Sequence, residues 1–200
     1  AIMCEKLDIN VWEVIDAAAT KPFGYMKFTP GPGLGGHCIP VDPHYLAWKM
    51  KTLDYRARFI ELAGQINTGM PNHVVELVSY GLNRKKKAVS GSRILLIGMA
   101  YKSDVDDVRE SPSLELISML INSGAKVEFS DPFFKSIPIT RKYKFELESK
   151  PLEKQIIASA DLVLLATDHD DFDYNLIFKE AKLIVDTRGR FPSSKKVIKA

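Results

Sequence analysis

Short apolar runs alternate with helical patterns through residues 92–190, and this alternation constrains the fold more than any other feature. Each run is brief and is followed by a glycine or a polar residue, as in parallel strands buried on both faces. The expected strands are 93–98, 125–129, 162–166 and 183–186. The expected helices between them are 112–123, 151–159 and 174–180. The alternation predicts an α/β domain with a doubly wound sheet.

Ligands of doubly wound sheets bind beyond the carboxyl ends of the strands. Polar stretches follow all four expected strands, at 99–107, 131–133, 167–171 and 187–190. The first strand ends in Gly98-Met-Ala-Tyr-Lys102 rather than in the GxGxxG fingerprint of dinucleotide sites, so this domain is not expected to bind NAD in the usual way. Lys102 could contact a phosphate and Tyr101 could stack on a base. A surface lysine and a partly buried tyrosine explain the same residues equally well.

A Pro/Gly-rich stretch at 20–43 interrupts the helical patterns in the first half of the chain. Ten of its residues are Pro or Gly, which excludes a helix or a central strand and predicts a long, ordered loop. The expected helices around it are 1–19, in two parts with Asn10 as the N-cap of the second, 44–51 and 55–86. The chain is therefore expected to divide into a helical domain with this loop, 1–88, and an α/β domain, 89–200.

Cys38 follows four closely spaced glycines of the loop, which are Gly31, Gly33, Gly35 and Gly36. Glycines let the backbone approach a ligand, and exposed N–H groups in such a segment form anion-binding concavities. Positive charge and N–H groups also activate a thiolate, whereas Cys4 lies in an amphipathic helical pattern and is expected to be a core residue. Asp42, four residues after Cys38, could orient or deprotonate a water. Cys38 and Asp42 together fit a mechanism in which an acyl-enzyme forms on the cysteine and is then hydrolysed.

Composition and charge exclude several classes of protein. A net charge of +3 is too small to indicate binding to nucleic acid or a membrane surface. The basic runs at 84–87 and 195–199 are expected to be a linker and a tail. No apolar stretch approaches the roughly 18 residues that span a bilayer, and no secretory signal is present. The two cysteines have no CxxC partner, which indicates that the protein lies in a reducing cytoplasm. The four histidines are scattered, so no metal site is expected. Ala1 opens inside a helical pattern without an N-cap, so we expect a fragment.

Three sequence motifs follow one another along the chain. They are the loop 28–43 with Cys38 and Asp42, Gly98-Met-Ala-Tyr-Lys102, and Asp107-Val-Arg-Glu-Ser-Pro112. Together they resemble those of the UDP-glucose/UDP-N-acetylhexosamine 6-dehydrogenases over about residues 1–190. Thr20-Lys-Pro-Phe-Gly24, and Pro-Val-Asp at 40–42 where UDP-glucose enzymes typically have Pro-Lys-Asp, are most similar to the UDP-N-acetylglucosamine/UDP-N-acetylmannosamine branch. The resemblance implies a helical central segment that mediates dimerisation, followed by a Rossmann-like UDP-binding domain.

The resemblance also implies the reaction. Such enzymes oxidise the C6 alcohol of a UDP-sugar to a carboxylate by two hydride transfers to NAD. Cys38 would trap the aldehyde as a thiohemiacetal that the second oxidation turns into a thioester. Asp42 would help to activate the water that releases the acid.

The same resemblance implies which residues bind the substrate. The glycine loop at 31–36 would wrap the sugar and the diphosphate, with Phe28 near the uridine. Lys102 would contact the substrate and Tyr101 would pack on the uracil. Arg109 belongs to a family motif, and ion pairs that hold its turn are an alternative role for it.

Arg188 would reach the phosphates of the cofactor. The family's NAD-binding domain, and a Lys and an Asn that assist catalysis, are not in this chain, so the chain alone is expected to be inactive. The implied partners are a UDP-sugar and a second copy of the chain, and the implied pathway is polysaccharide biosynthesis. Two alternatives stay open, a UDP-glucose 6-dehydrogenase and a non-catalytic UDP-sugar-binding or dimerisation module. No residue indicates which configuration at C2 of the sugar is recognised, so the sequence does not predict which N-acetylhexosamine is the substrate.

Overall fold

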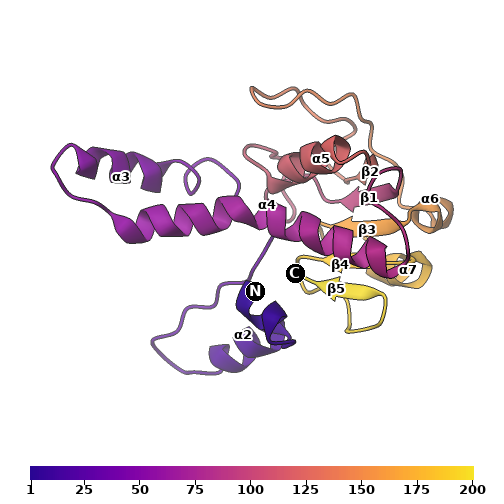
Figure 1. Ribbon diagram of the computed structural model, residues 1–200, viewed down its shortest axis with the longest axis horizontal. Coiled ribbons are helices and arrows are strands. Elements are labelled where there is room, and N and C mark those ends of the chain that lie inside the picture. Colours follow the sequence, from indigo (N-terminus) through magenta and orange to yellow (C-terminus); the bar gives the residue numbers. More distant parts are fainter.

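Five parallel strands form one sheet in the order β2-β1-β3-β4-β5 (Figure 1). A computed structural model describes residues 1–200. Its strands are β1 (Arg93–Ile97), β2 (Lys126–Ser130), β3 (Leu162–Leu165), β4 (Ile184–Asp186) and β5 (Val197–Lys199). In the central strand β1, Ile94 pairs with Val127 on one side and Leu162 on the other. The predicted doubly wound α/β fold is confirmed, with the order of strands reversing between β1 and β3.

Helices cover both faces of the sheet, and each face has its own hydrophobic core. On one face, α4 (Arg58–Arg84) and α5 (Pro112–Asn122) pack on Ile94 and Leu96 of β1. On the other face, α6 (Lys154–Ser159) and α7 (Tyr174–Glu180) pack on Leu95 and Ile97. Consecutive residues of β1 therefore serve opposite cores, which explains the uninterrupted apolar run in its sequence. Each fully buried Leu or Ile stabilises the fold by about 2 kcal/mol.

The first half of the chain contains α1 (Ile2–Lys6), α2 (Val11–Ala19) and α3 (Asp42–Lys51). The predicted N-cap is confirmed, because the Asn10 side chain accepts a hydrogen bond from the Trp12 N–H at 3.1 Å. The indole ring of Trp12 lies against Gly189, so α2 contacts the turn that follows β4. None of the helices combines the length and the hydrophobicity needed to cross a membrane.

The helix α4 continues through Pro71 and has two different halves (Figure 1). All of its buried residues lie between Met70 and Leu82, on the half that packs against the sheet. The other half projects from the α/β domain together with α3, and Phe59 there is 89% exposed. One continuous helix thus joins the part of the chain with the glycine loop to the part with the sheet.

An irregular segment between β2 and α6 covers the edge of the sheet. Ser149 bridges Phe129 of the edge strand β2, and the Lys150 N–H donates to the Phe129 carbonyl at 2.8 Å. Tyr143 and Phe145 stack on each other and pack on the core beneath α5. The segment therefore satisfies part of an edge that would otherwise be open.

Besides Cys4, which is half-buried on a helix without buried residues instead of lying in a core, two expectations from the sequence need correction. The basic tail predicted at 195–199 contains β5, because Val197 and Ile198 pair with Ile184 and Val185, and the Lys196 ammonium donates to the Ala181 carbonyl at 3.2 Å. The helix predicted from residue 44 begins earlier, at Asp42, since Pro43 is compatible with the first turn of a helix. This second difference places Asp42 on a helix rather than in the loop.

Candidate active site

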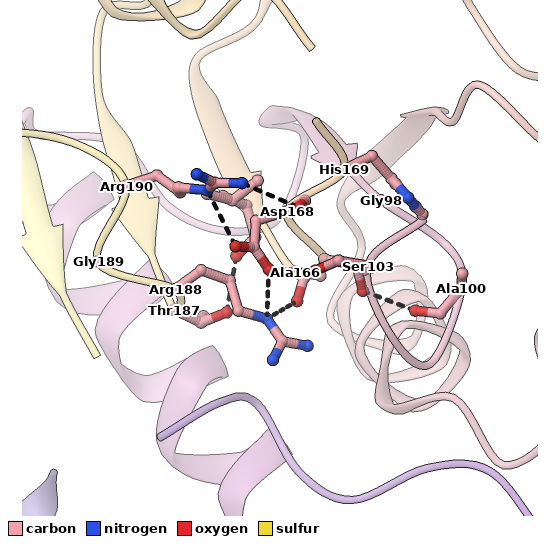
Figure 2. A network of polar contacts seen from close by, with 12 residues as sticks. Gly98, Ala100, Ser103, Ala166, Asp168, His169, Thr187, Arg188, Gly189 and Arg190 are labelled. Carbon is pink, nitrogen blue, oxygen red and sulfur yellow. Dashed lines mark hydrogen bonds and ion pairs between the residues drawn. The ribbon is translucent and has the colours of Figure 1, made fainter. Parts of the chain in front are cut away.

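The candidate site lies where the strand order reverses, beyond the carboxyl ends of β1, β3 and β4 (Figure 2). The turn after β1 contains Tyr101 and Lys102, the turn after β3 contains Asp168 and His169, and the turn after β4 contains Arg188. Open α/β sheets bind their ligands at such a switch point. The polar stretches predicted from the sequence therefore lie at one edge of the sheet.

The turn after β1 is held by hydrogen bonds on all sides. Gly98 has a φ of +87°, and a Cβ there would collide with the Thr167 carbonyl, which explains why the strand ends in glycine. The Thr167 hydroxyl donates to the Ala100 carbonyl at 2.6 Å, and the Met99 N–H donates to Asp131 at 2.5 Å. The turn is therefore rigid around its two candidate binding residues.

Lys102 is exposed and forms no hydrogen bond or ion pair within the protein. Its neighbour Ser103 donates to Asp168 at 2.9 Å, and Arg190 donates to the other oxygen of that carboxylate (Figure 2). The Asp168 carboxylate thus has partners of its own. The Lys102 ammonium remains available to an anion from outside the protein.

The glycine loop lies against the turns that follow β1 and β4. Gly31 lies against the Arg188 guanidinium, and Gly35 and Gly36 lie against the Tyr101 side chain. The Gly36 N–H donates to the Arg109 carbonyl at 2.8 Å, and its φ of +89° favours glycine. The structure thus brings together the loop, Tyr101 and Arg188, which the sequence had placed more than 60 residues apart.

Arg109 holds the turn beside the loop. Its guanidinium donates to both carboxylate oxygens of Asp107, at 2.6 to 3.0 Å. These hydrogen bonds lower the pKa of Asp107 and raise that of Arg109. The ion pair expected as the alternative, structural role of Arg109 is present.

Cys38 is exposed, with its Sγ 4.0 Å from Nδ1 of His37. The backbone N–H groups of Val41 and Asp42 donate to the Cys38 carbonyl at 3.1 and 2.8 Å. The first turn of α3 therefore fixes the backbone of Cys38 and leaves its sulfur free. The Asp42 side chain is exposed and has no partner, which leaves its carboxylate free to contact water.

Arg188 is held partly buried by the turn after β4. Its Nε donates to the Ala166 carbonyl at 2.7 Å and lies 3.8 Å from Asp168 (Figure 2). Burial lowers the pKa of Arg188. Asp186 fixes the turn by accepting hydrogen bonds from the N–H groups of Arg188, Gly189 and Phe191. The terminal nitrogens of Arg188 form no hydrogen bond, so they can contact an anion near Gly31.

A cleft of about 1140 Å³ lies between the loop, α4, the 106–112 turn and the segment 138–143. His37 and Ile39, on either side of Cys38, line it. The segment 138–143 carried no signal in the sequence that connected it to this site. Phe28 lies in the fully exposed stretch 21–29 and does not line the cleft.

The residues present do not provide a dinucleotide site at β1. The N-terminus of α5 follows β1 only after a long turn, and the Ser111 side chain already accepts from the Ser113 N–H there. No glycine-rich turn leads directly from β1 into a helix. No group of three or more His, Cys, Asp or Glu side chains could hold a metal ion.

Comparison with protein families gives two matches to one family. Residues 1–69 match the central domain of the UDP-glucose/GDP-mannose dehydrogenase family, and residues 95–192 match its UDP binding domain. A UDP-N-acetyl-D-mannosamine dehydrogenase of Campylobacter jejuni is 35% identical over 173 residues, which are 86% of this chain and 40% of that protein. An NDP-N-acetyl-D-galactosaminuronic acid dehydrogenase of Ralstonia solanacearum is 30% identical over 98% of this chain and 44% of its own length.

Comparison with solved structures also finds nucleotide-sugar dehydrogenases. A UDP-D-ManNAc dehydrogenase from Pyrococcus horikoshii is similar over 99% of this chain and 45% of its own, with a TM-score of 0.80 and 28% identity. The UDP-N-acetyl-mannosamine dehydrogenase Cap5O from S. aureus is similar over 98% of this chain and 44% of its own, with a TM-score of 0.73 and 30% identity. The chain thus spans less than half the length of these proteins.

Proposed function

Because the chain belongs to the UDP-glucose/GDP-mannose dehydrogenase family, we propose that it binds a UDP-N-acetylhexosamine and supplies the cysteine nucleophile for oxidation of the sugar C6 alcohol to a carboxylate. The observation that carries the proposal is the contact of the Cys38 loop with Tyr101 and Arg188. That contact brings an exposed thiol, a rigid turn with an unpaired lysine and a partly buried arginine to one edge of the sheet. The sugar end of a nucleotide bound at this edge lies toward Cys38.

In the proposed reaction the Cys38 thiolate adds to the C6 aldehyde, forming a C–S bond, and the carbonyl oxygen takes a proton. NAD bound in the complete enzyme would supply the oxidising capacity, as hydride acceptor, for the conversion of alcohol to aldehyde and of thiohemiacetal to thioester. Water then attacks the thioester with help from the free Asp42 carboxylate, the C–S bond breaks, and Cys38 regains its proton. Arg188 is the residue of this chain that we assign to the phosphates of NAD.

We assign uridine diphosphate to the turn after β1 and the glycine loop beside it. Tyr101 offers a ring face for the uracil, and Lys102 offers an unpaired charge for the diphosphate. The glycines at 31, 33 and 35 offer backbone N–H groups, Gly36 ties this loop to the Arg109 carbonyl, and Arg109 orders the turn beside them. Phe28 would contact the uridine only after the exposed stretch 21–29 folds over the site.

A non-catalytic UDP-sugar-binding module and a UDP-glucose 6-dehydrogenase are the competing functions. The free and exposed state of both Cys38 and Asp42 favours the enzyme over the module. Calorimetry of UDP with this chain tests the binding site. Assays of the intact enzyme with UDP-GlcNAc, UDP-ManNAc and UDP-glucose distinguish the substrates, and a lack of acid product from all three would leave the binding module as the function.

We also propose a homodimer through α3 and the N-terminal half of α4. Exposed apolar side chains gather there, and Phe59, Leu62 and Ile66 recur along one side of α4. Exposed patches of this kind mark association surfaces, and a second copy would bury the same residues symmetrically.

We place the enzyme in the cytoplasm, because two unpaired cysteines fit a reducing compartment. The pathway that we assign to it is the synthesis of polysaccharide precursors.

A further inference from the structure

His169 is a fully buried polar residue that the proposed reaction does not use. It follows β3, its side chain is 0% exposed, and it belongs to the group of residues drawn in Figure 2. Its ring makes edge contacts with Phe133 and Phe172, at centroid distances of 5.0 and 5.4 Å. A buried polar ring is costly unless both of its nitrogens have partners.

Both ring nitrogens are occupied, and their partners fix the tautomer. Nδ1 lies 2.9 Å from the backbone N–H of Asp104, which can only donate, so Nδ1 is an acceptor without a proton. Nε2 lies 3.1 Å from Asp131 and therefore carries the hydrogen and donates it to the carboxylate. A neutral ring with no free nitrogen and no exposure cannot exchange protons with a substrate. The His–Asp pair is thus not a general base.

Asp131 is a fixed acceptor for this ring. Its carboxylate also accepts hydrogen bonds from the N–H groups of Met99, Phe133 and Phe134. Burial alone would raise the pKa of Asp131, but the hydrogen bonds from His169 and from these backbone groups outweigh it and lower the pKa. Since Asp131 follows β2 and Asp104 follows β1, the His169 ring connects the ends of three strands.

Asp104 is the residue that this connection holds in place. Its φ of +57° is a left-handed conformation that non-glycine residues adopt at a cost in free energy, unless neighbouring contacts hold them there. His169 accepts its N–H, and its carboxylate accepts the N–H of Asp170. This fixed residue lies two positions after Lys102.

We propose that His169 is a positioning residue for the nucleotide sugar: its Nδ1 holds the Asp104 amide, and thereby orients the 101–104 turn so that Lys102 meets the diphosphate. The inference rests on the UDP site proposed above. It differs from that site because His169 cannot touch the ligand and acts only through Asp104.

A pair of variants separates the two hydrogen bonds. In His169→Asn the side-chain oxygen occupies about the place of Nδ1 and can still accept from Asp104, whereas in His169→Gln the amide nitrogen occupies about the place of Nε2 and donates only to Asp131. Both variants lose the ring contacts with Phe133 and Phe172, so each is the stability control for the other.

Calorimetry of UDP with the 200-residue chain is the first measurement. We expect His169→Asn to bind within about threefold of the wild type, and His169→Gln to bind about tenfold more weakly, as after loss of one buried hydrogen bond. Equal affinities in the two variants, or full affinity in His169→Gln, would overturn the proposal.

Two NMR measurements test the positioning role of His169 independently of UDP binding. Failure of the wild-type chain to bind UDP would refute the UDP site, and these measurements would still test the hydrogen bond to Asp104. Hydrogen exchange of the Asp104 amide should be about tenfold faster in His169→Gln than in His169→Asn, and equal rates would overturn the positioning role. The ¹⁵N shifts of the His169 ring in the wild-type chain should show a proton on Nε2 only. A proton on Nδ1 would contradict the hydrogen bond from Asp104, and this measurement needs no variant to fold.

Discussion

The Gly36 N–H donates a hydrogen bond to the Arg109 carbonyl at 2.8 Å, and this bond joins the loop that contains Cys38, the proposed nucleophile, to the domain that contains the sheet. Cys38 is only two residues away. The position of the thiol therefore depends on the turn that the Arg109–Asp107 ion pair maintains.

Gly36→Ala should impair both folding and ligand binding. A Cβ there would lie 2.9 Å from the Tyr101 ring, and the φ of +89° strains any other residue, so we expect a loss of about 1–3 kcal/mol in the free energy of unfolding. Chemical denaturation measures it. Gly69→Ala is the control, because Gly69 has open space around it inside α4 and should become more stable by about 0.5–1 kcal/mol. Equal effects of the two substitutions would refute the contact.

Cys38→Ser should abolish the acid product of the intact enzyme while UDP-sugar binding stays unchanged, because a hydroxyl does not form the thioester. Product analysis by mass spectrometry and calorimetry test the two halves of this prediction. Cys4→Ser is the matched control and should retain activity, since Cys4 lies in α1, outside the proposed site. Undiminished acid formation by Cys38→Ser would exclude the covalent mechanism.

Lys102→Ala should weaken UDP binding by about ten- to a hundredfold, the range for loss of a charge-assisted hydrogen bond. The wild-type affinity should also fall with added salt more steeply than that of the variant. Calorimetry at two salt concentrations measures both effects. Lys126→Ala removes an exposed lysine at the start of β2 and should leave the affinity unchanged. An unchanged affinity in Lys102→Ala would remove this residue from the site.

Phe59→Asp should convert the proposed dimer to a monomer, because it replaces an 89% exposed apolar side chain of the proposed α4 interface with a charge. Light scattering coupled to size-exclusion chromatography gives the mass directly. Met3→Asp changes an apolar, 78% exposed side chain on α1, outside that surface, and should not change the mass. A wild-type chain that is monomeric at high concentration would count against the interface.

Asp131→Asn should destabilise the chain by about 2 kcal/mol near neutral pH. The pKa of Asp131 in the folded state lies below its ordinary value of 3.8, so its stabilising contribution is present above about pH 4 and is lost as the pH falls through the lowered pKa. The difference in unfolding free energy between wild type and variant should therefore shrink in acid. Denaturation at several pH values measures it, and a constant difference would show that ionisation of Asp131 is not involved.

The strands and helices of the α/β domain could be predicted from the sequence because each apolar run contributes to two cores. The strand β5 could not, since its three residues pair on one side only and are flanked by lysines. The predicted glycine loop and Lys102 turn belong to one region in the structure, but their contact through Tyr101 depends on the packing of segments far apart in sequence.

Buried polar partners were the least predictable part of the candidate site. His169 is a single histidine in an acidic stretch, and nothing in its neighbourhood indicates that Asp104 and Asp131 meet its two nitrogens. The start of α3 was also missed by two residues. That difference matters chemically, because the helix places the Asp42 N–H on the Cys38 carbonyl.

The irregular segment that covers β2 is also where a protease would be expected to cut the chain. It contains Arg141, Lys142 and Lys144, which are targets for trypsin-like proteases, and only part of it is tied down by Glu115 and Ser149. A cut there would free part of the segment that covers β2, and the N–H and C=O groups on that edge could then pair with another chain. Protection of this sheet edge therefore depends on an irregular, basic segment and not on another strand.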